Sequence, residues 1–276
     1  MNPNQTSFSE KNVNKLIADL IEVSHEIRTT IDDLDDDKRR SKVDNSIMGS
    51  NQYELDVIAD EILHKHINDF PGYIISEERE LDKSRIESSD LILVVDPVDG
   101  STNASRKIGY WSFSAALVQS GSVIAGLVVD QVTNRKFIAT QNGGAKLVDG
   151  NGKVTTLDGS QFSTFDVGNR ADNFSGSLIC FNSHEGPSIP FRHLRHFGSS
   201  ALAICDVAAR GLDAYIDDED VLLRPWDLLA AEFIAKSAGC NVLRRDSSGI
   251  FAATGVLVTN SESLLVDFEG IFPHFF

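Results

Sequence analysis

The 276-residue chain is poor in cysteine, with only Cys180, Cys205 and Cys240. Three widely spaced cysteines provide neither an even-numbered disulfide framework nor a C-x-x-C metal site. Each lies in an apolar or helical context, which is typical of an inert buried thiol. Redox chemistry and thiolate metal sites are therefore not expected.

The chain also lacks a long apolar run. No segment approaches the roughly 18 consecutive apolar residues of a membrane-spanning helix. The N-terminal stretch MNPNQTSFSEKN has no basic region followed by an apolar core, so it does not resemble a secretory signal. We therefore expect a cytoplasmic protein that does not bind membranes.

Basic residues are few: 25 Lys and Arg stand against 41 Asp and Glu, which gives a net charge of −16. Nucleic acids and anionic membranes are bound by clustered Lys and Arg, so neither is an expected partner. Part of the acidity lies in IDDLDDDKRR, residues 31–40. We interpret this run as a solvated loop or a frayed helix end and not as a metal site, because its charges partly cancel along the chain.

Several phosphate and metal motifs are missing. The chain has no Gly-rich nucleotide loop, so kinase and GTPase chemistry have no support. A Ca²⁺ loop around DPVDG fails because Val95 and Pro97 occupy positions that need oxygen ligands. An aspartyl-phosphate nucleophile of the D-x-D-G-T type needs one intervening residue, whereas two separate Asp96 from Asp99.

The first half of the chain predicts helices packed on a largely antiparallel sheet. Hairpin turns are expected at QSGS and at QNGG, because Gly and Asn favour tight turns. A polar loop, RRSKVDNSIMGSNQ, separates the two helices. Apolar periodicity predicts helices over residues 9–30 and 55–63 and strands over 73–76, 91–95, 111–119 and 123–130.

The second half alternates between helices and strands, which predicts a second α/β layer. Gly239 stands where a helix C-cap is expected. We divide the chain into residues 1–150 and 151–276, two halves of one compact layered sandwich. The expected elements are strands at 177–181, 212–217, 241–245 and 256–259 and helices at 199–211 and 226–239.

Acidic residues stand at the ends of several predicted elements. Taken singly, each has a plain interpretation: Asp227 is a helix-capping residue, Asp99-Gly100 is a turn, and Glu77 with Glu78 is a solvated strand end. Taken together they favour one shared acidic site, because Glu77 and Asp96 both follow apolar strands. If those strands are neighbours, their carboxylates meet at one edge, repel one another and require a cation. An oxygen-only ligand set favours Mg²⁺ over Zn²⁺.

Three segments in order resemble the signatures of the inositol monophosphatase family, part of the Mg²⁺-dependent, lithium-sensitive sugar phosphatase superfamily. They are ISEE (75–78), DPVDGSTN (96–103) and RPWDLLAAEFIAKSAG (224–239), and the likeness extends over about residues 50–245. The Ser-Glu-Glu form is similar to prokaryotic members, some of which also accept fructose 1,6-bisphosphate. The resemblance implies an α+β fold of the layered αβαβα sugar phosphatase type and a homodimer.

The resemblance also implies the metal ligands. Glu77, Asp96 and the carbonyl of Val98 are expected to hold one Mg²⁺, and Asp96, Asp99 and Asp227 a second, in a site of two or three ions. Ser101, with Asp56 behind it, is expected to orient or deprotonate the attacking water, and Glu77 to share that role.

Contacts to the substrate follow in the same way. The amides of Gly100 and Ser101 are expected to bind phosphate oxygens. Candidates for the ring hydroxyls are Asp99, Ser199, Ser200 and Asp217, although Ser199 and Ser200 equally suit a helix N-cap after Gly198. Arg195 and Arg224 suit either a second phosphate or surface ion pairs.

Two positions depart from the family pattern. Ser101 replaces the usual Thr and keeps its hydroxyl, whereas Glu232 places a bulky charge where Gly is common, near the end of the site helix. The expected activity is hydrolysis of inositol 1-phosphate or a similar polyol or sugar phosphate. Fructose 1,6-bisphosphate and 3′-phosphoadenosine 5′-phosphate are alternatives, and a non-catalytic divalent-cation binder is a further one.

Overall fold

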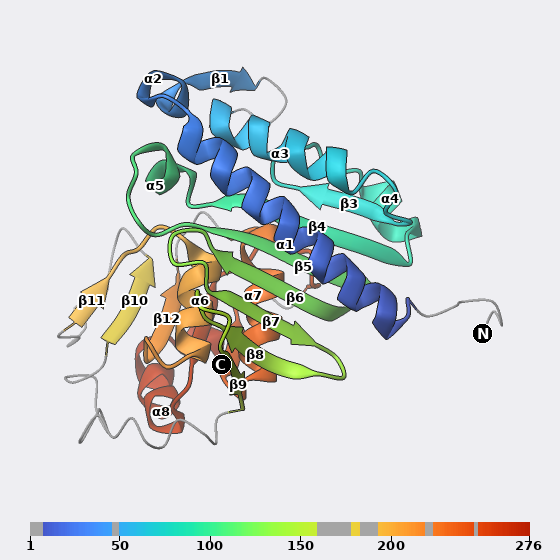
Figure 1. Cartoon of the computed structure of the whole chain (residues 1–276). Coiled ribbons are helices and arrows are strands. Elements are labelled where there is room, and N and C mark those ends of the chain that lie inside the picture. The colour runs from blue at the N-terminus through green and yellow to red at the C-terminus, as the bar shows by residue number, and fades with distance from the viewer. Residues whose placement is uncertain (1–7, 46–49, 159–177, 183–192, 219–222, 246–247) are drawn as a thin grey trace.

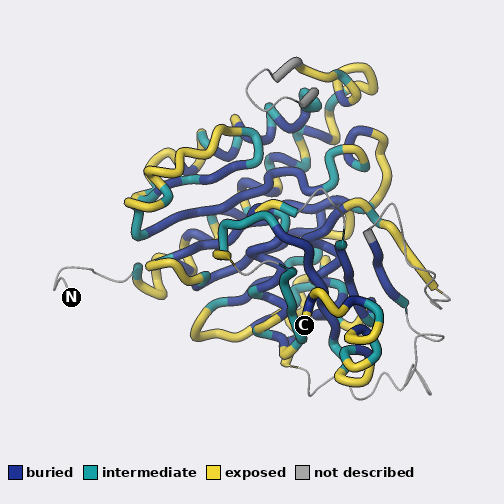
Figure 2. The backbone as a smooth tube through the Cα atoms, turned by 180° about the vertical axis from the view of Figure 1, so that it is seen from behind, coloured by how far each residue is buried: buried dark blue, intermediate teal, exposed yellow. Residues whose placement is uncertain are grey.

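A computed structural model describes residues 8–45, 50–158, 178–182, 193–218, 223–245 and 248–276. Its helices and strands alternate in five layers, helix, sheet, helix, sheet and helix (Figure 1). The predicted layered α+β fold is confirmed. Seen from behind, the buried backbone runs through the middle of the molecule, along the strands and the helices between the sheets (Figure 2).

The larger sheet has seven strands in the order β3-β4-β5-β6-β7-β8-β9. Only β3 and β4 run parallel, so the sheet is largely antiparallel, as predicted. At the predicted QSGS hairpin, Ser120 and Gly121 take positive φ angles of 48° and 75°, which match the twist of the flanking strands. The strands are β3 (Tyr73–Ser76), β4 (Leu91–Asp99), β5 (Ser112–Gln119), β6 (Ser122–Asp130), β7 (Lys136–Thr140), β8 (Gly144–Val148) and β9 (Val154–Leu157).

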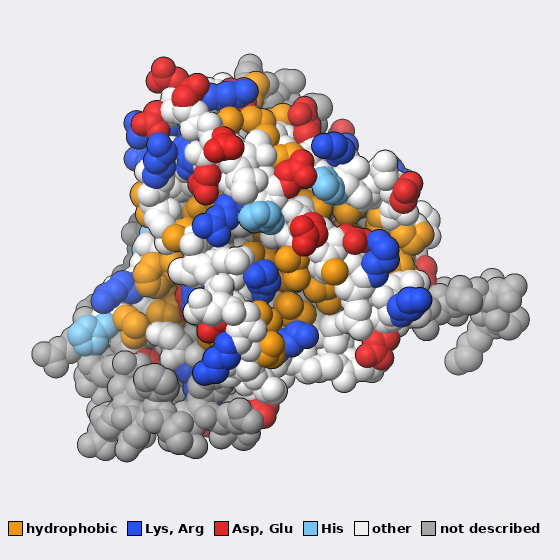
Figure 3. Space-filling model, viewed as in Figure 1, with side chains coloured by type: hydrophobic (Ala, Val, Ile, Leu, Met, Phe, Trp, Pro, Cys, Tyr) orange, Lys and Arg blue, Asp and Glu red, His pale blue; other side chains and the backbone are white. Residues whose placement is uncertain are grey.

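Two long helices cover one face of this sheet: α1 (Glu10–Asp33) and α3 (Glu54–His66) (Figure 1). The Ser9 hydroxyl caps α1 by accepting the amide of Asn12, and one apolar stripe of the helix is buried against the sheet. Acidic and basic side chains are interspersed over the outer surface of this layer (Figure 3). No helix of the described residues is long and apolar enough to cross a membrane.

Helices α6 (Ser200–Ala208) and α7 (Pro225–Ser237) lie between the two sheets, so most side chains in them are buried. Helix α7 packs closely on the larger sheet at Gly126, where a Cβ atom would lie 2.7 Å from the Ala230 carbonyl oxygen. The helix stops at the predicted glycine, since Gly239 takes a φ of 85° that other residues adopt at a cost.

The smaller sheet has five strands in the order β11-β10-β12-β14-β13, and helix α8 covers its outer face (Figure 1). Leu264 and Phe268 of α8 pack on this sheet through an apolar cluster with Ile216 and Leu257. The elements are β10 (Leu178–Asn182), β11 (His193–Arg195), β12 (Ala214–Asp217), β13 (Asn241–Arg244), β14 (Val256–Thr259), α8 (Glu262–Ile271) and the 3₁₀ turn Pro273–Phe275.

Some elements differ from prediction. The expected polar loop contains a two-stranded hairpin, β1 (Lys42–Asn45) with β2 (Ser50–Tyr53), whose tip lies outside the described residues. Of the two interpretations of the acidic run, the helix end fits its first residues, which finish α1, whereas its remainder forms the short helix α2 (Asp36–Arg40) and not an open loop. The sequence analysis also missed α8 and the short helix α4 (Lys83–Ser88), whereas the helical turn expected at Gly100 and Ser101 is the short helix α5 (Ser101–Ser105). Residue 177, the first of the predicted strand 177–181, lies outside the described residues.

A candidate metal and phosphate site

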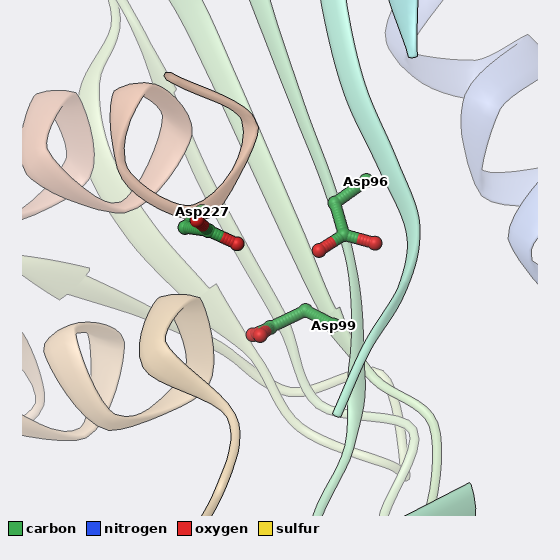
Figure 4. A group of neighbouring side chains, drawn as sticks. All are labelled: Asp96, Asp99 and Asp227. Atoms are coloured by element: carbon green, nitrogen blue, oxygen red, sulfur yellow. The ribbon is translucent and has the colours of Figure 1, made fainter. Parts of the chain in front are cut away.

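Three carboxylates meet between the larger sheet and α7 (Figure 4). Asp96 and Asp99 come from β4 and Asp227 from the first turn of α7, and one oxygen from each lies within 4.8 Å of the others. Asp96 and Asp99 are almost completely buried, and Asp227 is partly so. Segments far apart in the sequence thus form one acidic cluster.

Strand β4 does not end at the last residue of its apolar run but continues through Asp99. Asp96 pairs with Ser114 and Asp99 with Ser112, so three steps along β4 face two steps along β5. In a regular strand, residues 96 and 99 would point to opposite faces of the sheet. The β-bulge supplies the extra residue, and Pro97 sits within it because proline cannot donate a ladder hydrogen bond. The bulge therefore turns both carboxylates toward the same side.

Glu77 reaches the cluster from β3. Because Ser76 pairs with Val95 in the parallel β3–β4 ladder, Glu77 follows beside Asp96. The predicted neighbourhood of these two strand ends is confirmed. Burial, reinforced by the charges of Asp56 and Asp99, raises the pKa of Glu77 to about 7, against a hydrogen bond with Asp96 that lowers it.

Asp56 and Asp227 occupy the same position in their helices, the third residue of the first turn. The Tyr53 amide donates to Asp56 Oδ2 at 3.2 Å, and the Arg224 amide donates to Asp227 Oδ2 at 2.7 Å. The capping interpretation of Asp227 is therefore right, but it describes only one of the two carboxylate oxygens. Each helix fixes its aspartate by one oxygen and leaves the other for the site.

The electrostatics of the cluster are repulsive. Burial raises the pKa of Asp96 and of Asp227, and the neighbouring carboxylates of Glu77 and Asp99 raise both further. Burial also raises the pKa of Asp56 to about 6, even though hydrogen bonds from Ser101 and the Tyr53 amide lower it. Among the described residues, no Lys or Arg forms an ion pair with Asp96, Asp99 or Asp227. Within the described part of the chain, the cluster therefore lacks a protein cation.

Asp99 also caps the start of α6. Its carboxylate accepts the amides of Ser200 at 3.2 Å and Ala201 at 3.0 Å and the hydroxyls of Ser112 and Ser199. Ser199 is the N-cap residue of α6, as the capping interpretation expects, but its hydroxyl makes no capping hydrogen bond. A carboxylate from another segment replaces it, where the helix dipole favours negative charge.

Asp217 ends β12 beside the same region and is buried. The Tyr215 hydroxyl donates to Ser200 Oγ at 2.8 Å and lies 3.5 Å from Asp217 Oδ2. The charge of Asp217 contributes to raising the pKa of Asp227. The structure therefore brings the expected ring-hydroxyl residues near the carboxylate cluster. Sequence reasoning did not place Tyr215 and Ser112 in the site, because the apolar pattern of their segments identifies them only as strand residues.

The turn after β4 lies tight against the segment before α6. Gly100 has a φ of 100°, and a Cβ atom there would lie 2.9 Å from the Gly198 carbonyl oxygen, so glycine is required both for conformation and for space. Ser101 Oγ donates to the Val98 carbonyl at 3.0 Å. That carbonyl keeps a second lone pair for a metal ion.

Glu232 does not face the carboxylate cluster. It is buried on α7, with its Oε1 2.8 Å from Arg244 Nε and its Oε2 3.4 Å from Lys236 Nζ. It lines a separate cavity of about 410 Å³ beside the β5–β6 turn. Arg195 and Arg224 are exposed, and Arg195 donates to the Leu194 carbonyl. Nothing in these contacts assigns either arginine to a second phosphate.

Comparison with known proteins gives a consistent picture. A family model described as the inositol monophosphatase family matches residues 6–268. The chain is 28% identical to Nus factor SuhB of Pasteurella multocida, over 80% of this chain and 82% of that protein. It is 29% identical to inositol-1-monophosphatase of Mycobacterium leprae, over 65% of this chain and 64% of that protein.

The fold has close counterparts among solved structures. Inositol monophosphatase II from Staphylococcus aureus aligns with a TM-score of 0.71 and 19% identity, over 96% of this chain and 97% of that chain. Because the family model covers almost the whole length, the chain belongs to the inositol monophosphatase family.

Proposed function

We propose that the protein is a Mg²⁺-dependent phosphomonoesterase that hydrolyses inositol 1-phosphate or a similar polyol or sugar phosphate. The observation that carries the proposal is the convergence of Asp96, Asp99 and Asp227, with Glu77 beside them, in a cluster to which the described residues supply no cation. Family membership supports the same reaction class.

The residues fit divalent cations of the magnesium type. All side-chain donors are carboxylate oxygens, which Mg²⁺ prefers, and the described residues of the cluster include no His or Cys. Burial without a counter-ion is costly for carboxylates, and bound cations remove that cost. Asp96, Asp99 and Asp227 would hold one ion, and Glu77, Asp96 and the Val98 carbonyl another. When bound, such ions supply charge neutralisation and a more acidic water.

The protein's own groups supply positioning and proton transfer. In this proposal Ser101 orients the attacking water, and Asp56 receives its proton through the Ser101 hydroxyl. A carboxyl with a pKa of about 6 suits a group that accepts a proton near neutral pH and then releases it. The amides of Gly100 and Ser101 would bind phosphate oxygens.

The alcohol part of the substrate would lie between α6 and β12. Asp99, Ser199, Ser200 and Asp217 offer acceptors and hydroxyl donors there, a set suited to a polyol. Fructose 1,6-bisphosphate and 3′-phosphoadenosine 5′-phosphate remain alternatives, because a shared scaffold can serve several substrates. A panel of the three substrates with Mg²⁺ separates them by their kcat/KM values. If none of the three substrates released phosphate, the proposal would be contradicted.

Glu77→Gln tests the chemistry directly. We expect loss of most phosphate release, because the variant removes a metal ligand and a group beside the water. Glu232→Gln is the matched control: it alters a buried glutamate outside the cluster and is expected to retain activity. An active Glu77→Gln enzyme would contradict the proposed role of Glu77.

A non-catalytic role is a second candidate. The relative from Pasteurella multocida carries the name Nus factor SuhB, not that of a phosphatase. The prediction that nucleic acid is not a partner therefore stays a prediction. An inactive protein that still binds Mg²⁺ in calorimetry would favour this candidate. A cytoplasmic homodimer and inhibition by lithium also stay predictions, which size-exclusion chromatography and inhibition assays can check.

A further inference from the structure

Helix α5 carries Ser101 and has only five residues. A helix of one turn has no stability of its own, because nucleation costs more than a single hydrogen bond returns. Its N-cap residue, Gly100, has no side chain to cap it. The position of α5 must therefore come from contacts with other parts of the chain.

Arg39 makes such a contact from the acidic run that sequence analysis assigned to solvent. The residue is only 3% exposed. Its Nη1 donates to the Ala104 carbonyl of α5 at 3.0 Å, and its Nη2 donates to the Ile31 carbonyl in the last turn of α1. One guanidinium thus joins the carbonyl ends of two helices, where cations are favoured.

The burial of Arg39 is not explained by stability alone. Its Nε is buried without a hydrogen-bond partner, and its ion pair is a 3.4 Å contact to the exposed Asp32. Burying an incompletely paired cation costs free energy, and an apolar side chain of similar volume is often at least as stabilising. A role in fixing the relative positions of α1 and α5 accounts for the charge.

The carbonyl held by Arg39 is three residues from Ser101, at the other end of the same turn. The Ser101 hydroxyl is hydrogen-bonded to the Val98 carbonyl and lies beside Asp56. A shift of Ala104 would therefore tilt α5 and move the Ser101 hydroxyl relative to Asp56 and the carboxylate cluster.

We propose that Arg39 is a positioning residue of the candidate site: it holds α5 so that Ser101 faces Asp56 and the metal cluster. The inference rests on the proposed function. Other contacts also tie the same segment down. Asn103 Nδ2 donates to the carbonyls of Tyr110 and Phe197, and Lys107 pairs with Asp36 at 2.6 Å on the surface. Loss of Arg39 should loosen α5 without unfolding the protein.

The chain offers a matched control in Arg40, the next residue, which is exposed. Arg39→Ala and Arg40→Ala remove the same charge from the same helix. We expect kcat to fall by about 10- to 100-fold in Arg39→Ala, as for a misplaced catalytic group, with KM little changed. Arg40→Ala should match the wild type. Arg39→Lys should fall between them, since an ammonium lacks the fork that spans two carbonyls.

A double-mutant cycle tests the route through Ser101. If Arg39 acts by placing that hydroxyl, Arg39→Ala combined with Ser101→Ala should be no slower than Ser101→Ala alone. Additive losses in kcat would overturn the proposal. So would an Arg39→Ala variant that melts at a lower temperature yet keeps the wild-type kcat at 25 °C, because that is a purely structural role.

Amide hydrogen exchange gives a readout that needs no activity. Peptides covering residues 98–108 should exchange faster in Arg39→Ala than in the wild type or Arg40→Ala, while peptides from β5 and β6 stay unchanged. Equal exchange in all three proteins would overturn the placement of α5 by Arg39. If the wild type releases no phosphate in the substrate panel, the proposed function is wrong. Amide hydrogen exchange then still tests whether Arg39 holds α5 in place.

Discussion

In the part of the chain that the structure describes, two groups of buried and partly buried carboxylates differ in one respect. Asp130 and Asp206 share Arg135, whose Nη2 is 3.0 Å from Asp130 Oδ2 and whose Nη1 is 2.8 Å from Asp206 Oδ1. The Tyr110 hydroxyl also donates to Asp206 at 2.8 Å. This group, which we call the arginine-paired cluster, brings its own cation.

The cluster of Asp96, Asp99 and Asp227 has no paired Lys or Arg among the residues that the structure describes. Burial raises the pKa of Asp206 as it raises that of Asp96, but Arg135 opposes the rise for Asp206, whereas Glu77 and Asp99 add to it for Asp96. Burial alone does not mark a functional site, because structural ion pairs are buried too. The absence of a compensating charge separates the two clusters, and it points to a cation from solution.

The largest expected effect comes from Asp96→Asn. Loss of a shared metal ligand should reduce kcat/KM by on the order of 1000-fold or more, since metal ions contribute several kcal/mol to the transition state. The metal-free variant should be as stable as the wild type or more so, because one repelling charge is gone. Enzyme kinetics and thermal melts in EDTA measure both.

Asp206→Asn is the matched change in the arginine-paired cluster. It should lower the free energy of unfolding by about 1 to 3 kcal/mol, because buried partners lose a charged acceptor, and it should leave kcat/KM near the wild-type value. If the two variants behaved alike, the distinction between the clusters would be lost.

A second comparison removes the cation. Arg135→Met should lower the free energy of unfolding by about 2 to 3 kcal/mol, because it leaves two buried carboxylates unpaired; the partial exposure of Arg135 keeps this below the value for a fully buried pair. Urea unfolding measures the change. The control is Lys15→Ala, which breaks the exposed pair with Asp19 and should lower the free energy of unfolding by less than about 1 kcal/mol. Equal effects would show that burial does not strengthen the Arg135 pairs.

The smallest expected effect is a pH dependence of the metal-free protein. The pKa values of Asp56 and Glu77 are raised to about 6 and 7, so between pH 4 and 7 the folded state binds more protons than the unfolded state. Stability therefore falls as pH rises through this window. We expect the midpoint of thermal unfolding in EDTA to be a few degrees higher at pH 5.5 than at pH 7.5.

Saturating Mg²⁺ should reduce that difference, because bound cations favour the ionised carboxylates. Asp56→Asn should reduce it as well, since it removes one of the two titrating groups and a charge that raises the pKa of Glu77. A metal-free protein whose stability rises over this pH range would contradict the repulsion attributed to the cluster.

Much of the fold could be predicted where the signal is local. The apolar periodicity of α1 and α7 and the turn residues at Ser120 and Gly121 depend on neighbouring residues, and the structure agrees with them. Helix α8 was missed although Ser261 caps it, because only Leu264 and Phe268 form its buried stripe. Local patterns fail when few residues carry them.

The site was predicted less completely than the fold. The spacing of acidic residues after apolar strands led to Glu77 and Asp96, and the register of β3 with β4 agrees. The same local reasoning assigned Arg39 to a solvated run, and it gave Ser199 and Ser200 a capping alternative that Asp99 fills instead. Contacts between distant segments have no local signature.

The sequence by itself determined which chemistry is available: carboxylates at strand and helix ends, a glycine that permits a left-handed turn, and an apolar pattern that makes strands and helices. The tertiary structure decided how these groups face one another. The bulge that turns Asp96 and Asp99 to one side, the arrival of Asp227 from α7 and the burial of Arg39 against α5 all depend on packing between segments far apart in the chain. Propensity acts over a few residues, whereas the position of a charge relative to another charge is set by the whole core.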